Sequence, residues 1–361
     1  MAITGQCKRR RIVLNADAYI SGATSNVPVL VKFNSTSHAD LFGTGDDKDS
    51  VWFSTDAGGQ TTLYHEGVVF DSTDAIFYVK VDLSSTADTV IYLWYGLPAI
   101  TGTESKTNVW TNGKAIWHLE GTADSMGTYT LTFTNASNTS GQVGTCYDFT
   151  GSGSSATFTT ITLSASTNYT IMSWVYLDSL TNAYIIGYSS ASGCYVYVGG
   201  SNQNPYHSPD TSNNFVTFGQ SSSTSSWNLW SIVRTGTGNS CKGYKNATEG
   251  SPSYSGTLGD SPTFLKLANA AAAGYTLNGK LDEFWIFEDA KSANFIAAVY
   301  NNTANYSTFI SIDGAVTIGS SPKMVCPVWG ASSQQLSEDV DISSTSALTL
   351  TSLSTYSSSI S

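Results

Sequence analysis

The chain has 361 residues, of which 12% are charged, 12% are aromatic and 99 are serine or threonine, and its formal net charge is -11. The aromatic side chains supply enough apolar surface for folded cores, so the composition excludes a chain that is disordered throughout. Lysine and arginine number only 16, and four of them stand together at residues 8–11. No segment therefore carries the positive stripe that nucleic-acid binding requires. We expect a neutral ligand or another protein as the partner.

The five cysteines are widely spaced and form no Cys-x-x-Cys pair. This pattern predicts small buried side chains rather than a disulfide framework or a zinc site. No stretch approaches 18 consecutive apolar residues, so no membrane span is expected. The first twenty residues lack the apolar segment of a secretion signal, and we expect synthesis in the cytoplasm without export by that route.

Short runs of β-branched and aromatic residues, separated by Gly, Asp, Ser and Thr, recur along the chain. This spacing is typical of strands in sandwiches and jelly rolls, so we expect an all-β fold of two β-sandwich domains. The clearest predicted strands are residues 27–33, 75–83, 90–95, 169–177, 184–188, 194–198, 215–218, 227–234 and 281–287.

One short helix is predicted near the end of the strand-rich region. Ser292 is a suitable N-cap residue. Phe295, Ile296, Val299 and Tyr300 follow at the spacing that places them on one helix face.

Two changes in composition mark the expected domain boundaries. Residues 98–114 form a plausible linker, and after Asp313 the aromatic density falls. We therefore expect an N-terminal β-sandwich module at 1–114, a jelly roll at 115–312, and a Ser/Thr-rich C-terminal tail at 313–361.

The tail carries spaced apolar residues with little to pack against inside the tail itself. These residues predict a role in assembly, as a homo-oligomer or in a trimer or capsomer. They are Leu348, Leu350, Leu353 and Ile360.

The region from about Ala115 to Thr308 resembles a laminin-G-like, concanavalin A-like jelly roll. Four blocks carry the resemblance in the order of that family: IWHLEG, then CYDFTGSG, then NYTIMSWVYLDS, and finally the Gly-x-Leu-Asp-Glu strand with the helix after it. The resemblance implies a lectin-type sandwich whose rim loops bind a glycan or a protein.

The first hundred residues resemble an uncharacterised β-domain that often precedes laminin-G-like modules in bacterial and bacteriophage proteins. The blocks are KRRRIVLN, VPVLVKFN, VWFSTDAGGQTTLYHE, AIFYVKVDLSS and TVIYLWYG. Together with the missing secretion signal, this resemblance implies a phage virion protein, located in the virion and made in the host cytoplasm. A secreted, extracellular protein of a bacterium is the alternative.

The sequence predicts no enzyme and no catalytic residue. Related glycoside hydrolases carry Glu-x-Asp-x-x-Glu on one strand, and none of the seven glutamates here has an aspartate two residues on. No Gly-x-Ser-x-Gly elbow is present either. His118, between Trp117 and Leu119, is interpreted as a packed or hydrogen-bonded sheet residue rather than a base.

Structural calcium is the one cofactor that the jelly-roll resemblance implies. Carried over by position, the resemblance nominates Asp282 of the Gly-x-Leu-Asp-Glu strand and Asp124 of the opening loop as metal ligands. The alternative interpretation is that Asp282 or Glu283 hydrogen-bonds a neighbouring turn.

A glycan site is predicted in the polar loop at residues 199–212, because rim loops of jelly rolls carry many binding sites. The loop combines aromatic rings with amide and carboxylate groups that suit sugar hydroxyls. The candidate ligand-binding residues are Asn202, Asn204, Tyr206, His207 and Asp210, with His207 expected to be exposed.

The tryptophans divide into two predicted groups. Those in strand patterns are expected in the core, and the others are expected at an interface between the modules. The first group is Trp174, Trp230 and Trp285, and the second is Trp52, Trp94 and Trp110. The basic cluster at residues 8–11 is expected on a solvated edge strand that discourages aberrant pairing.

The leading functional hypothesis is a non-enzymatic bacteriophage virion protein, in a tail fibre or as a head decoration, that adheres to a host surface or a glycan. Its partners are then other virion proteins and itself. The first alternative is a secreted bacterial carbohydrate-binding or adhesion protein. The second alternative is a divergent glycosidase or depolymerase.

Overall fold

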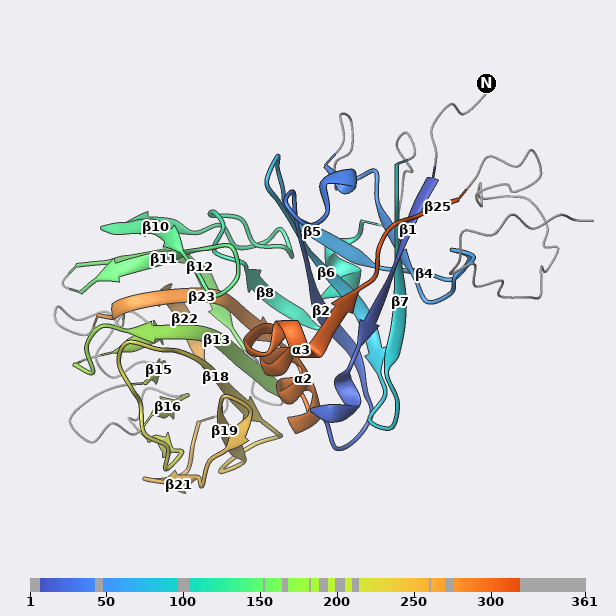
Figure 1. Cartoon of the computed structure of the whole chain (residues 1–361). Helices are drawn as coiled ribbons and strands as arrows, with labels where there is room; N and C mark the ends of the chain where they lie inside the picture. The colour runs from blue at the N-terminus through green and yellow to red at the C-terminus, as the bar shows by residue number, and fades with distance from the viewer. Residues whose placement is uncertain are drawn as a thin grey trace, which may run out of the picture. The chain divides into compact units, whose positions relative to one another are not determined.

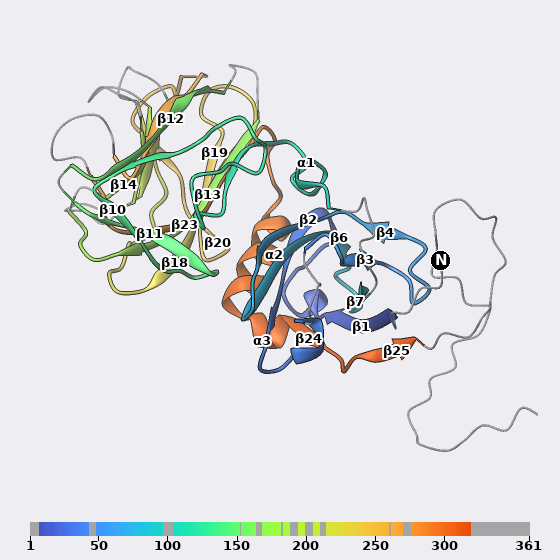
Figure 2. The same cartoon turned by 90° about the horizontal axis from the view of Figure 1, so that it is seen from above.

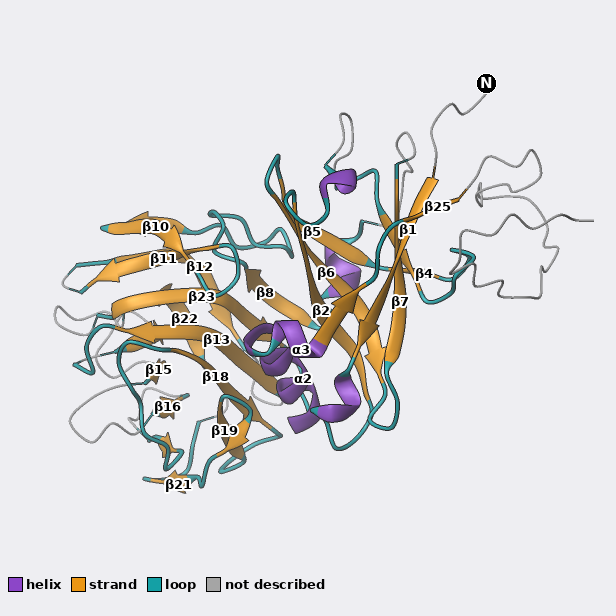
Figure 3. Ribbon diagram, viewed as in Figure 1, coloured by secondary structure: helices purple, strands orange, loops and turns teal. Residues whose placement is uncertain are grey.

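The structure is a computed structural model. It describes residues 7–42, 48–96, 104–151, 153–163, 168–181, 183–187, 194–198, 205–209, 214–259, 261–269 and 276–318. Antiparallel strands make up most of this part of the chain (Figure 3). The all-β prediction is therefore confirmed.

The N-terminal module, called the leader sandwich below, has two sheets. Its larger sheet runs in the order β24 (Ile310–Ile312), β1 (Cys7–Leu14), β7 (Thr89–Tyr95), β3 (Trp52–Ser54) and β4 (Thr62–Leu63), and β25 (Val316–Ile318) also pairs with β1. Its smaller sheet is β2 (Thr24–Asn34), β6 (Asp74–Leu83) and β5 (His65–Phe70). Two short 3-10 turns, η1 (Ala16–Ala18) and η2 (Ala39–Leu41), complete it.

The jelly roll also has two sheets, which lie face to face over a shared core. Its first sheet, called the inner sheet, runs β10 (Ala136–Ser140), β11 (Thr145–Thr150), β23 (Asn278–Phe287), β13 (Tyr169–Leu177), β18 (Trp227–Arg234), β19 (Cys241–Lys245) and β20 (Thr248–Glu249), with β8 (Gly113–Trp117) paired to β23.

The second sheet of the jelly roll, called the outer sheet, has eight strands. Their order is β21 (Ser253–Tyr254), β17 (Val216–Thr217), β16 (Tyr206–Ser208), β15 (Tyr195–Tyr197), β14 (Tyr184–Gly187), β22 (Thr263–Leu267), β12 (Ser155–Thr162) and β9 (Thr132–Thr134). All nine strands predicted from the sequence are present in the two modules.

The chain returns to the leader sandwich after it has built the jelly roll. β24 and β25 both pair antiparallel with β1, so that Ile312 lies opposite Ile12 and Ile318 lies opposite Cys7. Figure 1 shows these three strands side by side. The expected boundary at residue 312 thus does not coincide with the sheets. The jelly roll is an insertion between β7 and β24 of the leader sandwich.

Three helices accompany the strands: α1 (Lys106–Val109), α2 (Ala293–Ala304) and α3 (Tyr306–Phe309). The predicted cap is confirmed, because Ser292 accepts a hydrogen bond from the N–H of Phe295. α2 packs on the leader sandwich, where Asn302 accepts from the N–H of Leu30 at 2.6 Å and donates to its carbonyl at 3.1 Å. Figure 2 shows α2 beside β2.

Two large hydrophobic cores stabilise the structure. One lies between the two sheets of the jelly roll and contains Trp230. The other contains the leader core, the apolar face of α2 and the far face of the inner sheet, where Trp174 and Trp285 lie. All three tryptophans are buried, as predicted, but two of them face the leader sandwich rather than the interior of the jelly roll.

The second group of tryptophans also divides. Trp110 belongs to the core that joins the modules, as predicted. Trp52 and Trp94 instead stack on each other at 5.5 Å within the leader sandwich, in a separate cluster. Their assignment to the interface between the modules was wrong, because adjacent strands β3 and β7 place both rings on the face of the sheet that lies away from the jelly roll core.

The basic cluster does not form a solvated edge. β1 lies between β7 and the pair β24 and β25, so it is an interior strand. Alternation along the strand buries Arg10, whose guanidinium bonds Asp40, Tyr95 Oη and the carbonyl of Asp313. The prediction failed because the strands that cover β1 come from the other end of the described chain.

Four cysteines are buried in the described part: Cys7, Cys146, Cys194 and Cys241. This confirms the reading of the cysteines as packed side chains there. None of the described helices is long and apolar enough to cross a membrane. The apolar residues of the tail, from Leu348 to Ile360, lie outside the described residues.

Candidate functional site

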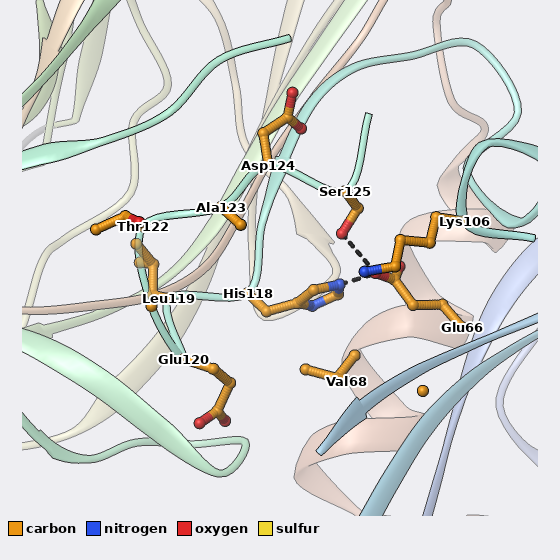
Figure 4. Close-up of a pocket in the computed structure, with 12 residues that line it drawn as sticks. Glu66, Val68, Lys106, His118, Leu119, Glu120, Thr122, Ala123, Asp124 and Ser125 are labelled. Carbon is orange, nitrogen blue, oxygen red and sulfur yellow. Dashed lines mark hydrogen bonds and ion pairs between the residues drawn. The ribbon is translucent and has the colours of Figure 1, made fainter. Parts of the chain in front are cut away.

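A pocket of about 190 Å³ lies where β5 and α1 of the leader sandwich meet the loop after β8 of the jelly roll. Its lining combines charged side chains of both modules with residues 119–123 of the loop after β8. Figure 4 shows the side chains of His118, Ser125 and Lys106 converging on the carboxylate of Glu66, while Glu120 and Asp124 are directed away from it.

The side chains around the pocket converge on Glu66, whose own side chain is only 2% exposed. Its Oε2 accepts from Trp110 Nε1 at 2.5 Å and lies 3.3 Å from His118 Nε2. Its Oε1 accepts from Ser125 Oγ at 2.7 Å and lies 3.7 Å from Lys106 Nζ. The carboxylate therefore receives donors from both modules.

The other nitrogen of His118 contacts a second carboxylate. Nδ1 lies 2.7 Å from Oε2 of Glu283, which also accepts from Trp285 Nε1 at 2.9 Å. Tyr78 of β6 stacks on the imidazole with a centroid distance of 5.0 Å. The imidazole is thus enclosed by two carboxylates and aromatic rings. We call Glu66, His118 and Glu283 the charge cluster.

A β-bulge positions Glu283. Trp174 pairs with Asp282 and Met172 pairs with Trp285, so β23 carries an extra residue at this point. Glu283 has a φ of +50°, a backbone conformation that costs a non-glycine residue about 1–2 kcal/mol. The bulge breaks the two-residue alternation of the strand. The carboxyl groups of Asp282 and Glu283 therefore both lie outside the jelly roll core.

The protonation states of His118 and Glu66 are fixed around neutral pH. Burial alone would lower the pKa of His118, but the charges of Glu283 and Glu66 outweigh burial and raise it to about 10. Burial alone would raise the pKa of Glu66, but the charge and hydrogen bonds of its partners lower it to about 2. Neither group exchanges a proton near pH 7, so the pair is poorly suited to acid–base catalysis.

Two more carboxyl groups anchor the turn between β10 and β11. Asp282 Oδ2 accepts from the N–H of Val143 at 2.8 Å, and Glu120 accepts from the N–H and hydroxyl of Thr145. Burial and the charge of Glu283 raise the pKa of Asp282 well above its ordinary value. Asp282 therefore serves a neighbouring turn, as the alternative interpretation held.

Asp124, the other nominated calcium ligand, organises its own loop. Its Oδ1 accepts from the N–H groups of Ile116 and Met126, and its Oδ2 accepts from those of Thr128 and Tyr129. Each oxygen thus already receives two donors. Among the residues that the structure describes, no group of three or more His, Cys, Asp and Glu side chains could hold a metal ion. The two aspartates do not fit a shared calcium site there.

The predicted glycan loop is only partly described. Asn202, Asn204 and Asp210 lie outside the described residues, and Tyr206 is placed by its backbone alone, in β16. His207 is fully buried, with Nε2 2.7 Å from Tyr169 Oη and Nδ1 2.9 Å from the carbonyl of Tyr195. Its expected exposure was wrong, because it follows Tyr206 on a strand and alternation turns it into the core.

A cluster of tyrosines lies on β14 and β15 of the outer sheet. Tyr184 contacts Tyr195 and Tyr197 edge to face, with centroid distances of 5.3 and 4.7 Å. Val196, the strand neighbour of Tyr195 and Tyr197, belongs to the jelly roll core. The three rings therefore lie on the opposite face of the outer sheet, separate from both large cores. All three are buried, since each keeps only 6–7% of its surface exposed.

Sequence reasoning found neither the charge cluster nor the tyrosine cluster. Glu66 and His118 lie in different modules, and no spacing rule connects them. The available signal was His118 itself, since a buried ionisable group requires a charged or hydrogen-bonding partner. At positions 195–197 two tyrosines flank Val196, a pattern that predicts a strand but not a cluster of rings.

Comparisons with known proteins find distant similarity to several solved structures and one matching family model. Domain 4 of AbnA, an extracellular arabinanase of Geobacillus stearothermophilus solved with arabinotriose, has a TM-score of 0.43 and 16% identity, covering 53% of this chain and 99% of that domain. The binding domain of Paraclostridial Mosquitocidal Protein 1 has a TM-score of 0.42 and 15% identity, covering 53% of this chain and 52% of that one.

The binding domain of botulinum neurotoxin serotype D has a TM-score of 0.37 and 15% identity, covering 55% of this chain and 53% of that one. No curated protein sequence matches the chain. A family model does match within the jelly roll: residues 150–297 fit the one described as the concanavalin A-like lectin/glucanases superfamily, of laminin-G type. The inserted module is therefore a concanavalin A-like jelly roll of the laminin-G type.

Proposed function

We propose that this protein is a non-enzymatic adhesion protein that binds glycans through its jelly roll, on the face of the outer sheet that carries Lys266. The observation that supports the proposal best is the match of residues 150–297 to the family described as the concanavalin A-like lectin/glucanases superfamily. The tyrosine cluster lies on the same sheet face, where its three rings are buried and pack against one another.

The register of the outer sheet places a cation beside the tyrosines. Gly187 of β14 lies opposite Tyr195 on one side and Lys266 of β22 on the other. Directly opposed residues share a face, so the three form one row with no side chain at its centre. Lys266 makes no ion pair with any residue that the structure describes. Its ammonium group is available to hydroxyl or carboxylate groups of a sugar.

The charge cluster supports the non-enzymatic part of the proposal. A hydrolase needs one carboxyl group that holds a proton and one that accepts a proton or attacks. Glu66 and His118 are instead held as permanent ions, below the surface and bonded to each other. Glycosidase or depolymerase activity remains the alternative against which the proposal is tested.

The setting that we propose is a bacteriophage particle, in which the protein is a tail fibre or head decoration component. This part rests on the resemblance of the leader segments to a β-domain common in bacterial and phage proteins. Mass spectrometry of particles purified from the same host would test it. Absence of the protein from those particles would favour the secreted bacterial adhesion protein.

The proposed activity is tested with the full chain on an array of bacterial surface polysaccharides, followed by a reducing-end assay on every polysaccharide that is bound. We expect binding to at least one glycan without release of new reducing ends. Reproducible cleavage by the purified protein would overturn the non-enzymatic assignment. Absence of binding across the array would contradict the glycan-adhesion assignment.

A further inference from the structure

We infer that the leader sandwich holds the jelly roll in a fixed orientation. We also infer that the charge cluster joins the two modules into one cooperative folding unit. This inference concerns the otherwise unassigned N-terminal module. It goes beyond the proposed glycan binding and holds whether or not a glycan is bound.

The connectivity gives the first argument. The chain passes from the leader sandwich to the jelly roll once, through α1 and β8, and passes back once, through β23 and α2. β24 and β25 then complete the leader sheet beside β1. Neither module is a continuous piece of chain that a flexible linker joins to the next. Two crossings restrict hinge motion more than one.

The charge cluster gives the second argument. The side chains of Glu66 and Glu283 are 2% exposed and that of His118 is 8% exposed. If the modules separated, the imidazolium would lose one of its two carboxylates, and Glu66 would lose its partners in the jelly roll. Breaking a buried pair on one side is strongly unfavourable. The charges therefore oppose separation.

The apolar packing gives the third argument. A single continuous core contains Leu30 of the leader sandwich, Trp110 of the connection, Ile296 of α2, and Trp174 and Trp285 of the inner sheet. Trp110 and Trp285 lie 4.8 Å apart by ring centroids. Because one core serves both modules, loss of packing in one module is transmitted to the other.

A pair of reciprocal variants of the full chain tests the inference. Glu66→Gln removes the charge from the leader side while keeping the shape of the side chain. Ser125→Ala removes one hydrogen bond to Glu66 from the jelly-roll side. Because this change is milder, the variant can still be measured if Glu66→Gln fails to fold. Asp178→Asn is the control, because Asp178 is exposed after the end of β13 and belongs neither to the charge cluster nor to the shared core.

Scanning calorimetry and hydrogen exchange provide the measurements. For the wild type we expect one melting transition whose calorimetric and van't Hoff enthalpies agree. For Glu66→Gln we expect a melting temperature lower by on the order of 10 °C. We also expect at least roughly tenfold faster exchange in β13 and β23 of the jelly roll. Ser125→Ala should accelerate exchange in β5 and β6 of the leader sandwich, and Asp178→Asn should leave the leader sandwich unchanged.

Two results would overturn the inference. The first is a wild-type protein that melts in two independent transitions, one for each module. The second is faster exchange that stays inside the module carrying the substitution, in both Glu66→Gln and Ser125→Ala.

Discussion

Oε2 of Glu66, on a strand of the leader sandwich, lies 3.3 Å from Nε2 of His118, at the end of the first jelly-roll strand. The contact is buried, and a second carboxylate, that of Glu283, occupies the other side of the imidazole. The imidazole faces both carboxylates only when both modules are in place. The same contact raises the pKa of His118 and lowers that of Glu66, which makes the pair poorly suited to acid–base catalysis near pH 7.

Replacing the imidazolium tests this balance directly. In His118→Gln, the side chains of Glu66 and Glu283 remain buried without the cation between them. We expect a loss of about 3–5 kcal/mol in the free energy of unfolding, since one partner of a buried ion pair has been removed. Urea denaturation followed by tryptophan fluorescence measures this change.

His38→Gln is the matched control, because His38 packs against Phe33 in the leader sandwich and faces no buried carboxylate pair. We expect its effect to stay within about 1 kcal/mol. Equal effects of the two substitutions would contradict the role assigned to His118.

The charge cluster also predicts how stability depends on pH. The raised pKa of His118, about 10 against 6.5 in the unfolded chain, adds stability that is complete below pH 6.5 and is lost as the pH rises towards 10. The lowered pKa of Glu66, about 2 against 4.5, adds stability that is complete above pH 4.5 and is lost as the pH falls towards 2. The contribution of the pair is therefore greatest between pH 4.5 and 6.5.

Melting temperatures across pH 3–10 measure this profile. The other ionisable groups near the imidazole are Glu283, Tyr78, Lys106 and Glu120. Tyr78 stays neutral because burial raises its pKa. The alkaline decline should be much smaller in His118→Gln than in the wild type. If the melting temperature fell equally at alkaline pH in both proteins, groups other than His118 would cause the fall, and the role assigned to His118 would be contradicted.

Gly144 tests the turn that Glu120 and Asp282 anchor. This residue has a φ of +57°, and a Cβ atom there would lie 1.8 Å from Oε1 of Glu120. We expect Gly144→Ala to destabilise the protein by more than about 1 kcal/mol, through backbone strain and displacement of Glu120. Gly127→Ala is the comparison, since Gly127 has a φ of +74° but open space around it. Thermal melting should show the larger loss for Gly144→Ala.

Asp282 separates the two interpretations of its carboxyl group. Because its pKa is raised well above the ordinary value, the neutral isostere in Asp282→Asn should change the melting temperature little. The same variant tests the calcium hypothesis from the sequence, which is measured by melting in calcium and in chelator. A calcium-dependent stabilisation of the wild type that disappears in Asp282→Asn would show that Asp282 is a metal ligand.

Local sequence patterns were sufficient for the strands and the helix, whereas the laminin-G-type module was indicated by the resemblance of four sequence blocks to that family. Alternation and turn residues depend on neighbours in the sequence, and the cap at Ser292 depends on its own first helical turn. The same local rules misplaced residues 8–11, since the strands that cover β1 come from residues 310–318. Whether a strand is interior or at an edge is a property of the whole topology.

The candidate site was less predictable for the same reason. His207 was expected to be exposed because its loop is polar, but its strand turns it into the core against Tyr169. Glu283 could not be assigned to a face from the two-residue period, because a bulge interrupts that period. The charge cluster consists of residues from two modules. A single sequence contains no signal that residues so far apart in the chain are in contact.

The most direct test of the central claim measures the affinity of the full chain for a glycan selected on the array, by isothermal titration calorimetry. We predict that Lys266→Ala weakens binding at least about threefold, since its ammonium group lies on the sheet face proposed to bind the sugar. Tyr64→Ala, which removes an exposed tyrosine of the leader sandwich, should leave the affinity unchanged. Unchanged affinity in a folded Lys266→Ala variant would contradict the claim that this face binds the glycan.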